Sequence, residues 1–342
     1  MISIVVPCYN SENTIKHLVE LLCKQTYSEY EIVLVDDGST DDTPHICDEL
    51  SHEDQRIKVV HQGNRGLIGA WKRGVRESSG DYIAFCDADD YLDADFIEKI
   101  TGIISDYNPE IIVYGMVIDY SDGRSVLSVN RLNKGFYDEK KIRDTILPNL
   151  LSDGSMQSEL MFASRWSKVF NKRVLISVMD ELNESVSIGE DLLTTFSTMQ
   201  VVKSLYCMGD YCPYHYYRHS DSMIGRFDNE IFEKIDILFD EINRVAKVYS
   251  YSYTDQLRYE RLSVTLLNIK KYICRSTEGY GRTVETVRKV RESDEIMDCI
   301  QHCSISKYSR LSRIFAYLFV RGLYGLLYFT ARIAEQMRRR SI

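Results

Sequence analysis

Short apolar runs alternate with segments of helical periodicity over the first hundred residues of the chain. Four of the runs are rich in β-branched residues and apolar on both faces, which is typical of strands buried on both sides of a sheet. The predicted strands are Ile2–Val6, Glu31–Val35, Ile57–Val60 and Tyr82–Cys86. In the segments between them, apolar residues recur three or four positions apart, as on one face of a helix. The predicted helices are Asn13–Lys24, Thr43–Leu50 and Gly66–Glu77.

The alternation of strands and helices predicts an α/β fold class. Successive strands joined by helices make right-handed crossovers, and they therefore form a mainly parallel, Rossmann-like sheet with flanking helices. Ligands of such sheets bind beyond the carboxyl ends of the strands. The residues that directly follow each predicted strand are therefore the first candidates for a functional site.

Beyond Asn229 the pattern changes to long helical periodicities. The predicted helices there are Ile231–Tyr249, Thr254–Cys274 and Ser309–Met337. We therefore expect a helical C-terminal region over residues 229–342.

Composition places the chain among globular proteins. Of its 342 residues, 44% are hydrophobic, 27% charged and 11% aromatic, which is enough to bury one large core or two modest ones. The formal net charge of −9 argues against a protein that binds nucleic acid. The charge is uneven, because residues 301–342 hold eight cations and one anion, so that residues 1–300 carry −16. An acidic body with a basic tail indicates that the tail meets an anionic partner.

Cysteine usage and the N-terminus lead us to expect a cytoplasmic protein. The nine cysteines include no CxxC pair, and several lie within apolar runs, as expected for small buried hydrophobes in a reducing compartment. The N-terminal sequence lacks the basic region and the cleavage site of a signal peptide. The sequence contains no stretch of eighteen uncharged apolar residues, so no ordinary membrane span is expected.

Acidic residues gather after the second and fourth predicted strands. They are Asp36, Asp37, Asp87, Asp89 and Asp90. A single aspartate in a loop is commonly a turn former or a helix cap. That interpretation is favoured for Asp41, Asp42, Asp93 and Asp95. Five carboxylates at one edge of a sheet repel one another unless a cation or a hydrogen-bonding ligand joins them. We therefore favour a divalent ion that takes its other ligands from a diphosphate and water.

Six segments resemble, in order, the motifs of the family-2 glycosyltransferases with the GT-A fold. They are Val5–Asn10, Val35–Asp41, Phe85–Asp90, Trp166–Phe170, Gly189–Leu193 and Tyr216–Arg218 followed by Ser222. The resemblance runs at family spacing from Ile2 to about residue 225. It implies a nucleotide-sugar-binding half over residues 1–105 and an acceptor-binding and catalytic-base half over residues 106–228. It does not cover residues 229–342.

The resemblance assigns the donor site to residues that follow the predicted strands. Asp37 would accept a hydrogen bond from the base, which favours uridine or thymidine over cytidine because their rings carry an N–H there. Asp87 would contact ribose or metal-bound water, and Asp89 would ligate Mn²⁺ or Mg²⁺ beside the diphosphate. The implied nucleotide-sugar-binding set is Pro7, Tyr9, Asp37, Arg65, Asp87, Ala88, Arg218 and Ser222. A core aromatic is the alternative interpretation of Tyr9.

Asp191 would be the catalytic base, and Glu190 would position the acceptor or support the base. The segment Ser187–Glu190 also matches a capping box, so that both acids would open a helix over Leu192–Met199. The two interpretations are compatible, because the helix dipole keeps a carboxylate in the first turn anionic, as a general base requires. One base opposite the leaving diphosphate implies an in-line displacement with inversion at the anomeric carbon.

The acceptor site implied by the resemblance contains Trp166, Lys168 and Glu190. A buried Trp with a surface Lys is the structural alternative for the first two. The metal set contains Asp87, Asp89 and His219. His215 is a second histidine in the same Tyr-rich segment, where packing or hydrogen bonding is more common than ligation.

Cations for the diphosphate are expected from two places. Arg218 resembles the family residue that reaches back to the diphosphate, and Ser222 would assist it. The cation that the family commonly has shortly after Asn64 is missing here. Arg65 or Lys72 would replace it.

The last predicted helix is cationic and amphipathic. Arg310, Arg321 and Arg332 are eleven positions apart and would share one face of a single helix, beside a broad apolar surface. Such a helix fits peripheral contact with the anionic inner face of the plasma membrane, where a lipid-linked glycan would be the acceptor. Packing against the catalytic domain and a homodimer interface are the alternatives.

The sequence therefore predicts an inverting, metal-dependent glycosyltransferase. It would move a sugar from a nucleotide-diphospho sugar, with a UDP-sugar favoured, to a hydroxyl of a glycan or lipid-linked glycan in polysaccharide biosynthesis. A phosphohydrolase of the haloacid dehalogenase type is one alternative, although it would have Thr or Val in place of Asp90 and would leave Asp36 and Asp37 unexplained. A non-catalytic nucleotide-binding scaffold at the membrane is another, and it would not require Asp89 and Asp191 together.

Overall fold

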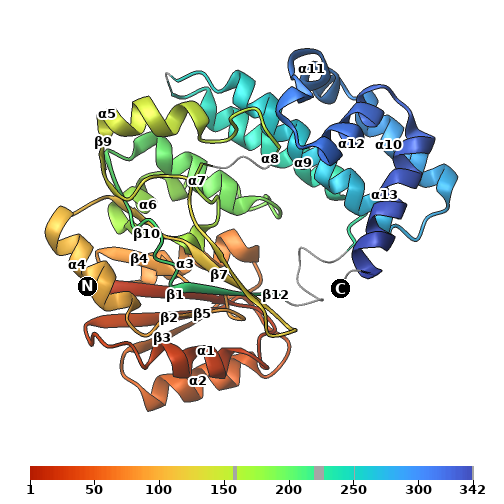
Figure 1. Cartoon of the computed structure of the whole chain (residues 1–342). Helices are drawn as coiled ribbons and strands as arrows, with labels where there is room; N and C mark the ends of the chain where they lie inside the picture. Colours follow the sequence, from red (N-terminus) through yellow and green to blue (C-terminus); the bar gives the residue numbers. More distant parts are fainter. Residues whose placement is uncertain (157–159, 219–226, 250, 341–342) are drawn as a thin grey trace. The chain divides into compact units, whose positions relative to one another are not determined.

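The computed structural model describes residues 1–156, 160–218, 227–249 and 251–340, and the chain divides into two compact units (Figure 1). The first unit contains the β-sheets and consists of Met1–Leu147 and Met161–Ser220. The second unit is helical and consists of Pro148–Leu160 and Asp221–Ile342.

An eight-stranded sheet with the order β3-β2-β1-β4-β10-β6-β11-β9 is the centre of the first unit. Its first four strands in that order are mutually parallel, and β10 runs antiparallel to both β4 and β6. The strands are β1 Ile2–Cys8, β2 Tyr30–Asp36, β3 Ile57–His61, β4 Tyr82–Phe85, β6 Ile111–Val113, β9 Gly135–Asp138, β10 Lys168–Asn171 and β11 Ser204–Cys207. Residues of β1, β2 and β4 are buried on both faces of the sheet, as their unbroken apolar runs predict.

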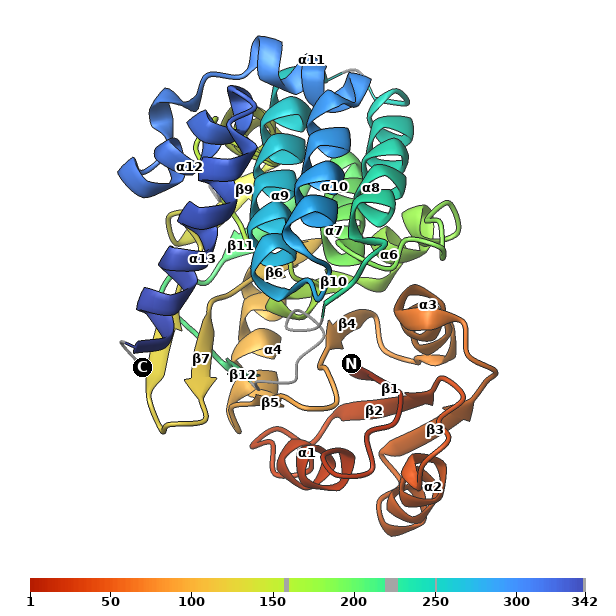
Figure 2. The same ribbon diagram turned by 90° about the vertical axis from the view of Figure 1, so that its right-hand side faces the viewer.

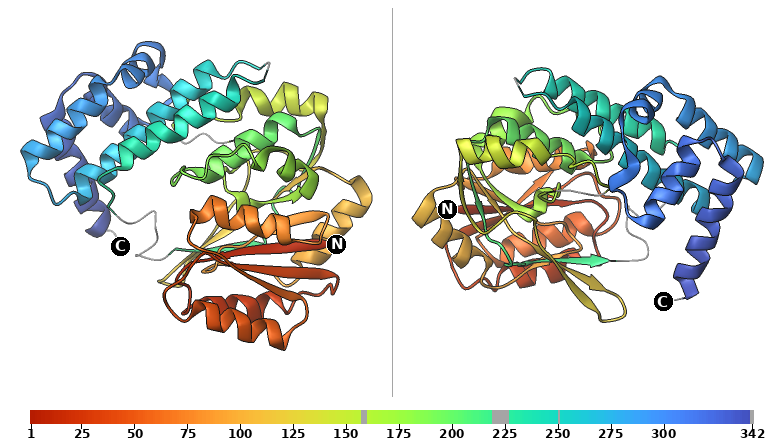
Figure 3. Two further views of the ribbon diagram at one scale, coloured as in Figure 1. Left: turned by 180° about the vertical axis from the view of Figure 1, so that it is seen from behind. Right: turned by 45° about the horizontal axis from the view of Figure 1, so that its top comes forward.

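Helices cover both faces of the parallel strands (Figure 3). α1 (Ile15–Leu22) and α2 (Thr43–Glu53) lie on one face, and α3 (Gly66–Glu77) lies on the other. Gly74 brings α3 close to the sheet, because a Cβ there would lie 2.3 Å from Cγ1 of Val5. The remaining longer helices of this unit are α4 Phe96–Tyr107, α6 Lys172–Met179 and α7 Glu190–Val201. Its short elements are α5 Glu139–Lys141, a π-helical turn at Ile142–Ile146 and a 3₁₀ turn at Arg165–Ser167, and a further 3₁₀ turn at Leu147–Asn149 leads into the second unit.

A smaller sheet of four strands continues from the acidic loop after β4. Its order is β5-β12-β7-β8, and β12 pairs in parallel with β7 and antiparallel with β5. The strands are β5 Tyr91–Leu92, β7 Met116–Tyr120, β8 Ser125–Ser128 and β12 Tyr214–Arg218. The loop at residues 86–90 therefore joins the large sheet to the small one.

The helical unit is arranged around α9, its longest helix, with α8 and α10 alongside (Figure 2). Its elements are α8 Ile231–Ala246, α9 Thr254–Arg275, α10 Tyr280–Glu292, α11 Asp294–His302, a 3₁₀ turn at Ile305–Lys307, α12 Arg310–Val320 and α13 Tyr324–Arg340. The buried positions Leu262, Leu266, Ile269 and Ile273 recur along one side of α9 and form its core.

The seven elements predicted for the first hundred residues are confirmed, with ends that differ by three residues at most. The single helix predicted over Ser309–Met337 is wrong, because the chain turns at Gly322, which has a φ of +67°, and separates α12 from α13. The eleven-residue spacing of Arg310, Arg321 and Arg332 therefore does not place the three on one face of one helix. Within the part of the chain that the structure describes, no helix is long and apolar enough to cross a lipid bilayer.

Candidate active site

The turn after β2 separates the roles of its two acids. Asp36 is tied into the turn, since Oδ1 accepts the N–H of Ser39 at 3.0 Å and Oδ2 lies 3.0 Å from Nδ1 of His61. Asp37 accepts the side-chain amide of Gln62 at 2.7 Å and the N–H of Arg65 at 2.9 Å, both on Oδ1. Among the described residues, no donor contacts its Oδ2. Of these two acids, Asp37 is therefore the one with a carboxylate oxygen left for a ligand.

Gly38 makes this turn possible. Its φ is +74°, in the left-handed region, and a Cβ there would lie 2.8 Å from the backbone N of Asn64. Only glycine combines this dihedral angle with such a close approach of the next loop, so that Asp37 is held against the segment after β3.

The proline and the tyrosine at the end of β1 occupy different environments. Pro7 is buried within the strand, whereas Tyr9, just beyond it, is 52% exposed. The alternative interpretation of Tyr9 as a core aromatic is therefore wrong. Its ring is available to a ligand at the carboxyl end of the sheet.

The two candidates for the missing cation lie in different settings. Lys72 is buried, and its Nζ donates to the carbonyl of Leu182 at 2.7 Å and lies 3.4 Å from Glu184. Burial also lowers its pKa below the ordinary value of 10.5. Arg65 is exposed and pairs with Glu184 at 2.8 Å. Lys72 is thus occupied inside the fold, and Arg65 is the accessible cation of the two.

The loop after β4 presents two acids and buries a third. Asp89 is exposed and Asp87 is half-buried, whereas Asp90 is 3% exposed. Asp90 accepts the hydroxyl of Tyr214 at 2.6 Å and the N–H of Tyr217 at 2.9 Å. Burial and repulsion by Asp87 and Asp89 raise the pKa of Asp90 to about 8. Asp90 therefore anchors the loop to β12 and is not one of the exposed acids of the rim.

Arg165 connects this loop to α7. Its side chain is fully buried, and its two terminal nitrogens donate to Oδ1 of Asp191 at 2.7 Å and to Oδ1 of Asp87 at 3.1 Å. The guanidinium carbon lies 5.2 Å from the centre of the Phe85 ring. The structure thus brings the acidic loop and the candidate base together at one cation. The sequence pattern did not single out Arg165; the signal that could have found it is a cation placed directly before the Trp166 motif.

Burial of this cluster affects its acids strongly. Desolvation raises the pKa of Asp87 to about 6, with repulsion from Asp191 and Asp89 adding to it and Arg165 opposing it. Desolvation, followed by repulsion from Asp191, raises the pKa of Glu190 to about 7. Carboxyl groups with perturbed pKa values at the carboxyl edge of such a sheet are typical of an active site.

Glu190 and Asp191 stand in the first turn of α7, as predicted. The capping box predicted over Ser187–Glu190 is absent from this described segment, because the N-cap is Gly189, with a φ of +65° and no side-chain cap. The helix dipole still favours the anionic form of both acids in this first turn.

Trp166 and Lys168 are both buried. Trp166 stacks on Tyr214 with ring centres 4.2 Å apart and lies 5.8 Å from the ring of Tyr216. Nζ of Lys168 donates to the carbonyl of Ser164 at 2.8 Å, so a surface Lys is the wrong expectation for this position. Both side chains are therefore held within the fold, Trp166 by its aromatic stack and Lys168 by a backbone carbonyl.

β12 supplies a histidine near its start and a cation at its end. Arg218 is exposed, 5.8 Å from the ring of Tyr120. His215 lies between Asp119, at 2.8 Å, and Asp93, at 3.2 Å, and stacks on Tyr91. Both its ring nitrogens therefore face carboxylates of the small sheet. His219 and Ser222 lie outside the residues that the structure describes.

Asp87 and Asp89 fit a divalent cation that shares its coordination with a ligand. Both supply hard carboxylate oxygens, and within the described ranges no hydrogen-bond donor contacts Oδ2 of Asp87. In the same part of the chain, no group of three His, Cys, Asp or Glu side chains is arranged to hold a metal ion. An ion here would therefore complete its shell with phosphate oxygens and water, as Mg²⁺ and Mn²⁺ do in nucleotide sites.

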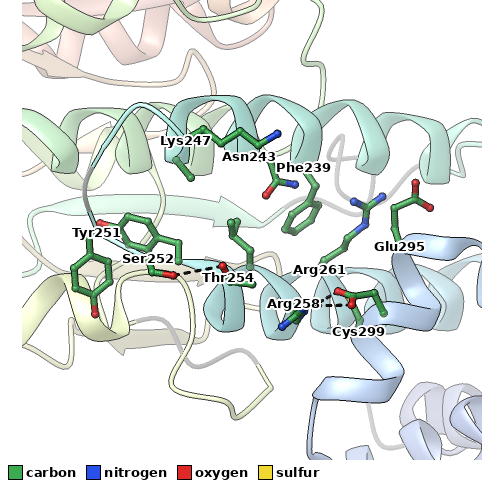
Figure 4. A pocket seen from close by; sticks show the side chains of 14 residues that line it. Phe239, Asn243, Lys247, Tyr251, Ser252, Thr254, Arg258, Arg261, Glu295 and Cys299 are labelled. Carbon is green, nitrogen blue, oxygen red and sulfur yellow. Dashed lines mark hydrogen bonds and ion pairs between the residues drawn. The ribbon is translucent and has the colours of Figure 1, made fainter.

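Two of the cavities in the described structure lie away from the motif residues. One, of about 400 Å³, lies in the helical unit between α8 and α9, where Arg258 pairs with Asp298 at 2.7 Å (Figure 4). The other, of about 690 Å³, lies beside Met1 and Gly80 at the amino ends of β1 and β4. Neither of these two cavities is lined by the acids at the carboxyl edge of the sheet.

Curated proteins with related sequences are glycosyltransferases. The chain is 32% identical over 190 residues to the glycosyltransferase GlyA of Streptococcus pneumoniae serotype 4, a match that covers 56% of this chain and 27% of that protein. It is 25% identical over 298 residues to the putative glycosyltransferase EpsH of Bacillus subtilis, covering 84% of this chain and 81% of EpsH. The chain thus spans about a quarter of the length of GlyA and most of that of EpsH.

Solved structures share the fold at low sequence identity. S. aureus TarS 1–349 in complex with UDP-GlcNAc matches with a TM-score of 0.62 and 17% identity, over 98% of this chain and 91% of that one. The mannosyltransferase PcManGT from Pyrobaculum calidifontis, in complex with GDP-Man and Mn²⁺, matches with a TM-score of 0.52 and 12% identity, over 97% and 86% of the two chains.

The family itself is established by the sequence. Residues 3–177, just over half of the chain, match the family described as Glycosyl transferase family 2. This range contains β1 to β4, the acidic loop and Arg165. The chain therefore belongs to glycosyl transferase family 2 and has the GT-A fold.

Proposed function

We propose that the chain is an inverting, metal-dependent glycosyltransferase that moves a sugar from a nucleotide-diphospho sugar to a hydroxyl of a glycan or lipid-linked glycan in polysaccharide biosynthesis. The observation that carries the proposal is the meeting of Asp87 and Asp191 at Arg165. Asp87 belongs to the loop where the family places the leaving diphosphate, and Asp191 belongs to the helix where it places the base. One buried cation thus joins a group from each half of the proposed displacement.

A UDP-sugar is the favoured donor. Asp37 is fixed by Gln62 and Arg65 with one carboxylate oxygen left over, as a partner for a ring N–H requires. Tyr9 is exposed beside it, with Pro7 and Ala88 as further contacts. TarS, a structure with the same fold, has been solved with UDP and with UDP-GlcNAc.

Asp87 and Asp89 would hold Mn²⁺ or Mg²⁺, with His219 as a further ligand. When bound, the ion supplies charge that stabilises the departing diphosphate. PcManGT, which shares the fold, has been solved with Mn²⁺. Arg65, Arg218 and Ser222 are the protein groups proposed to contact the diphosphate directly.

Asp191 is the proposed base. The acceptor oxygen forms a bond to the anomeric carbon while the bond from that carbon to the diphosphate oxygen breaks, and the hydroxyl proton passes to Asp191. The configuration at the anomeric carbon is inverted, since a single displacement occurs. Glu190 and Trp166 would position the acceptor from either side of the base, with Lys168 holding the backbone of the Trp166 segment.

The acceptor would be presented at the cytoplasmic face of an anionic membrane. α12 and α13 expose large apolar side chains at helical spacing. They are Leu311, Ile314, Tyr317, Leu326, Phe329, Ile333 and Met337. The cations Arg310, Arg313 and Arg321 lie among them and are also exposed. An apolar face with cations around it matches a lipid surface, and a homodimer is the other occupant that a test must distinguish.

A thermal-shift panel of nucleotide sugars with and without Mn²⁺ tests donor and metal together. We expect one UDP-sugar to raise Tm only when Mn²⁺ is present, and we expect Asp89→Asn to abolish the shift. Asp294→Asn, which changes an exposed acid in the first turn of α11, is the control and should leave it unchanged. A shift by a GDP-sugar alone would contradict the uridine assignment.

Transfer assays test the chemistry. Asp191→Asn should keep donor binding and lose transfer, whereas retained transfer would remove the base assignment. Release of phosphate from a phosphomonoester would instead support the phosphohydrolase alternative. Nucleotide binding without any turnover would support the scaffold.

A further inference from the structure

Arg165 is a buried cation at the junction of two motif segments. Its side chain is 1% exposed, and it belongs to a 3₁₀ turn directly before β10. One terminal nitrogen donates to Asp191 at 2.7 Å and the other to Asp87 at 3.1 Å. Nε has no hydrogen-bond partner among the described residues. The guanidinium therefore uses its ends to join two carboxylates that come from elements about one hundred positions apart in the sequence.

Stability alone does not account for this arrangement. Removing an arginine and two carboxylates from water costs free energy that their attraction only partly offsets, and apolar replacements of buried ion pairs are often equally stable. What a guanidinium adds is direction, because its planar donors fix the orientation of each carboxylate that they contact. Lysine, with a compact ammonium group, would supply the charge without that fixed fork.

The two contacts leave the second carboxylate oxygen of each acid available to a ligand. Arg165 binds Oδ1 of Asp87 and Oδ1 of Asp191, and in the described ranges no donor contacts Oδ2 of either residue. Without the cation the two carboxylates would repel each other, and Glu190, next to Asp191 at the start of α7, would add to the repulsion. The cation therefore allows three acids to share one site.

We propose that Arg165 is a positioning residue for glycosyl transfer. It holds Asp87 and Asp191 in one fixed relation, so that the acceptor hydroxyl and the leaving diphosphate lie in line on opposite sides of the anomeric carbon. This inference rests on the proposed function. Arg165 contacts no reacting atom and acts only through the two acids. Loss of the fork misplaces the base relative to the donor, and small displacements of reacting groups are costly to the rate.

Arg165→Lys and Arg165→Met are the test variants. We expect kcat to fall about 100-fold in both, because Lys restores the charge but not the two-ended contact. The donor KM should change less than kcat, since the proposed donor contacts of Tyr9, Asp37 and Asp89 do not involve Arg165. A residue with a merely structural role would lower Tm and leave kcat of the folded enzyme intact.

Arg56→Lys is the matched control. Arg56 is a partly buried arginine that pairs with Asp54 at 2.6 Å at the amino end of β3, the opposite edge of the same sheet. We expect this variant to lower Tm without changing kcat. A kcat for Arg165→Lys equal to that of the wild type would overturn the inference while the proposed function stands.

A cycle of Tm values separates the inference from the proposed function. The Tm change of the double variant Arg165→Met with Asp191→Asn should differ from the sum of the two single changes. For Arg56→Lys with Asp191→Asn, the change in the double variant should equal that sum. Additive shifts for the first pair would overturn the inference, whether or not the enzyme turns over. If the wild type released no nucleotide from any nucleotide sugar, the proposed function would fail, and with it the role of Arg165 in transfer.

Discussion

The hydroxyl of Tyr214 donates a hydrogen bond to Oδ2 of Asp90 at 2.6 Å and accepts the N–H of Asp87 at 3.1 Å. Tyr214 belongs to β12 of the small sheet, and both partners belong to the loop that follows β4 of the large sheet. One buried hydroxyl therefore fixes the acidic loop against the second sheet. The position of Asp89, which lies between the two partners, depends on it.

Tyr214→Phe should both destabilise the protein and disturb the acidic loop. It leaves the buried carboxyl of Asp90 without its side-chain donor, which costs ~1–3 kcal/mol of the free energy of unfolding. Denaturant titration measures this change. We also expect weaker Mn²⁺-dependent donor binding. Tyr107→Phe, at a ring that is 46% exposed, is the control and should change neither quantity.

Glu190 gives a prediction for the pH dependence of the rate. Its pKa is raised to about 7, so it is protonated below that pH and anionic above it. The anion can accept a hydrogen bond from the acceptor hydroxyl, so the rate should rise with pH and level off above about 7. Glu190→Gln should remove this inflection. An unchanged profile would show that another group produces it.

The same pKa shift affects stability with a definite sign. The ordinary pKa is 4.5 and the folded one is about 7, so between these values the folded state binds a proton that the unfolded chain releases. The contribution of Glu190 to stability is therefore fully present below pH 4.5 and is lost as the pH rises to about 7. We expect the Tm of the wild type to fall between pH 4.5 and about 7. The Tm of Glu190→Gln should depend less on pH over the same interval.

The two cations near α3 should separate binding from stability. Arg65→Ala should raise the donor KM and leave the free energy of unfolding within ~0.5 kcal/mol, because its side chain and its ion pair with Glu184 are exposed. Lys72→Met should leave the carbonyl of Leu182 without a donor and cost ~1–3 kcal/mol. Its donor KM should not change. Kinetics and denaturant titration of both variants check the pair, and the reverse pattern would assign the diphosphate contact to Lys72.

The exposed apolar face of α13 should bind anionic vesicles. Leu326 and Phe329 are 60% and 58% exposed, so replacing both with Gln should leave Tm unchanged and abolish co-flotation with phosphatidylglycerol vesicles. Leu327→Gln, at a buried position of the same helix, should instead lower Tm. Flotation that depends on salt and fails with phosphatidylcholine is the expected result. Loss of a dimer in light scattering, without loss of vesicle binding, would assign the face to self-association.

The parallel half of the sheet could be predicted because each of its strands has a signal in its own sequence and the same strand–helix pattern repeats. Each of β1, β2 and β4 is a continuous apolar run. Because these strands are buried on both faces, apolar residues do not alternate with polar ones, and the run itself identifies the strand. The middle of the chain is different. β10 enters between β4 and β6 in antiparallel orientation, and this pairing of distant segments has no local sequence signal.

The site was predictable to a similar extent. Asp37 and Asp89 follow predicted strands, so their place at the carboxyl edge follows from local pattern, whereas Asp191 was singled out by the family resemblance. Arg165 was missed because a buried arginine is identified only by its partners, and those lie in two distant segments. Asp36 and Asp90 were grouped with the exposed acids, although His61 and Tyr214 bind them within the fold. A count of carboxylates does not reveal which of them face inward.

The stretch Pro148–Leu160 belongs to the helical unit although the chain returns from it to the sheets. The N–H of Leu151 donates to Gln256 on α9, and Lys307 donates to the carbonyl of Asp153. The C-terminal module is thus built from two separate pieces of the gene product. An exchange of the helical unit between related chains would have to carry both pieces, because a chimera joined at a single junction would leave one piece facing a surface that evolved for another partner.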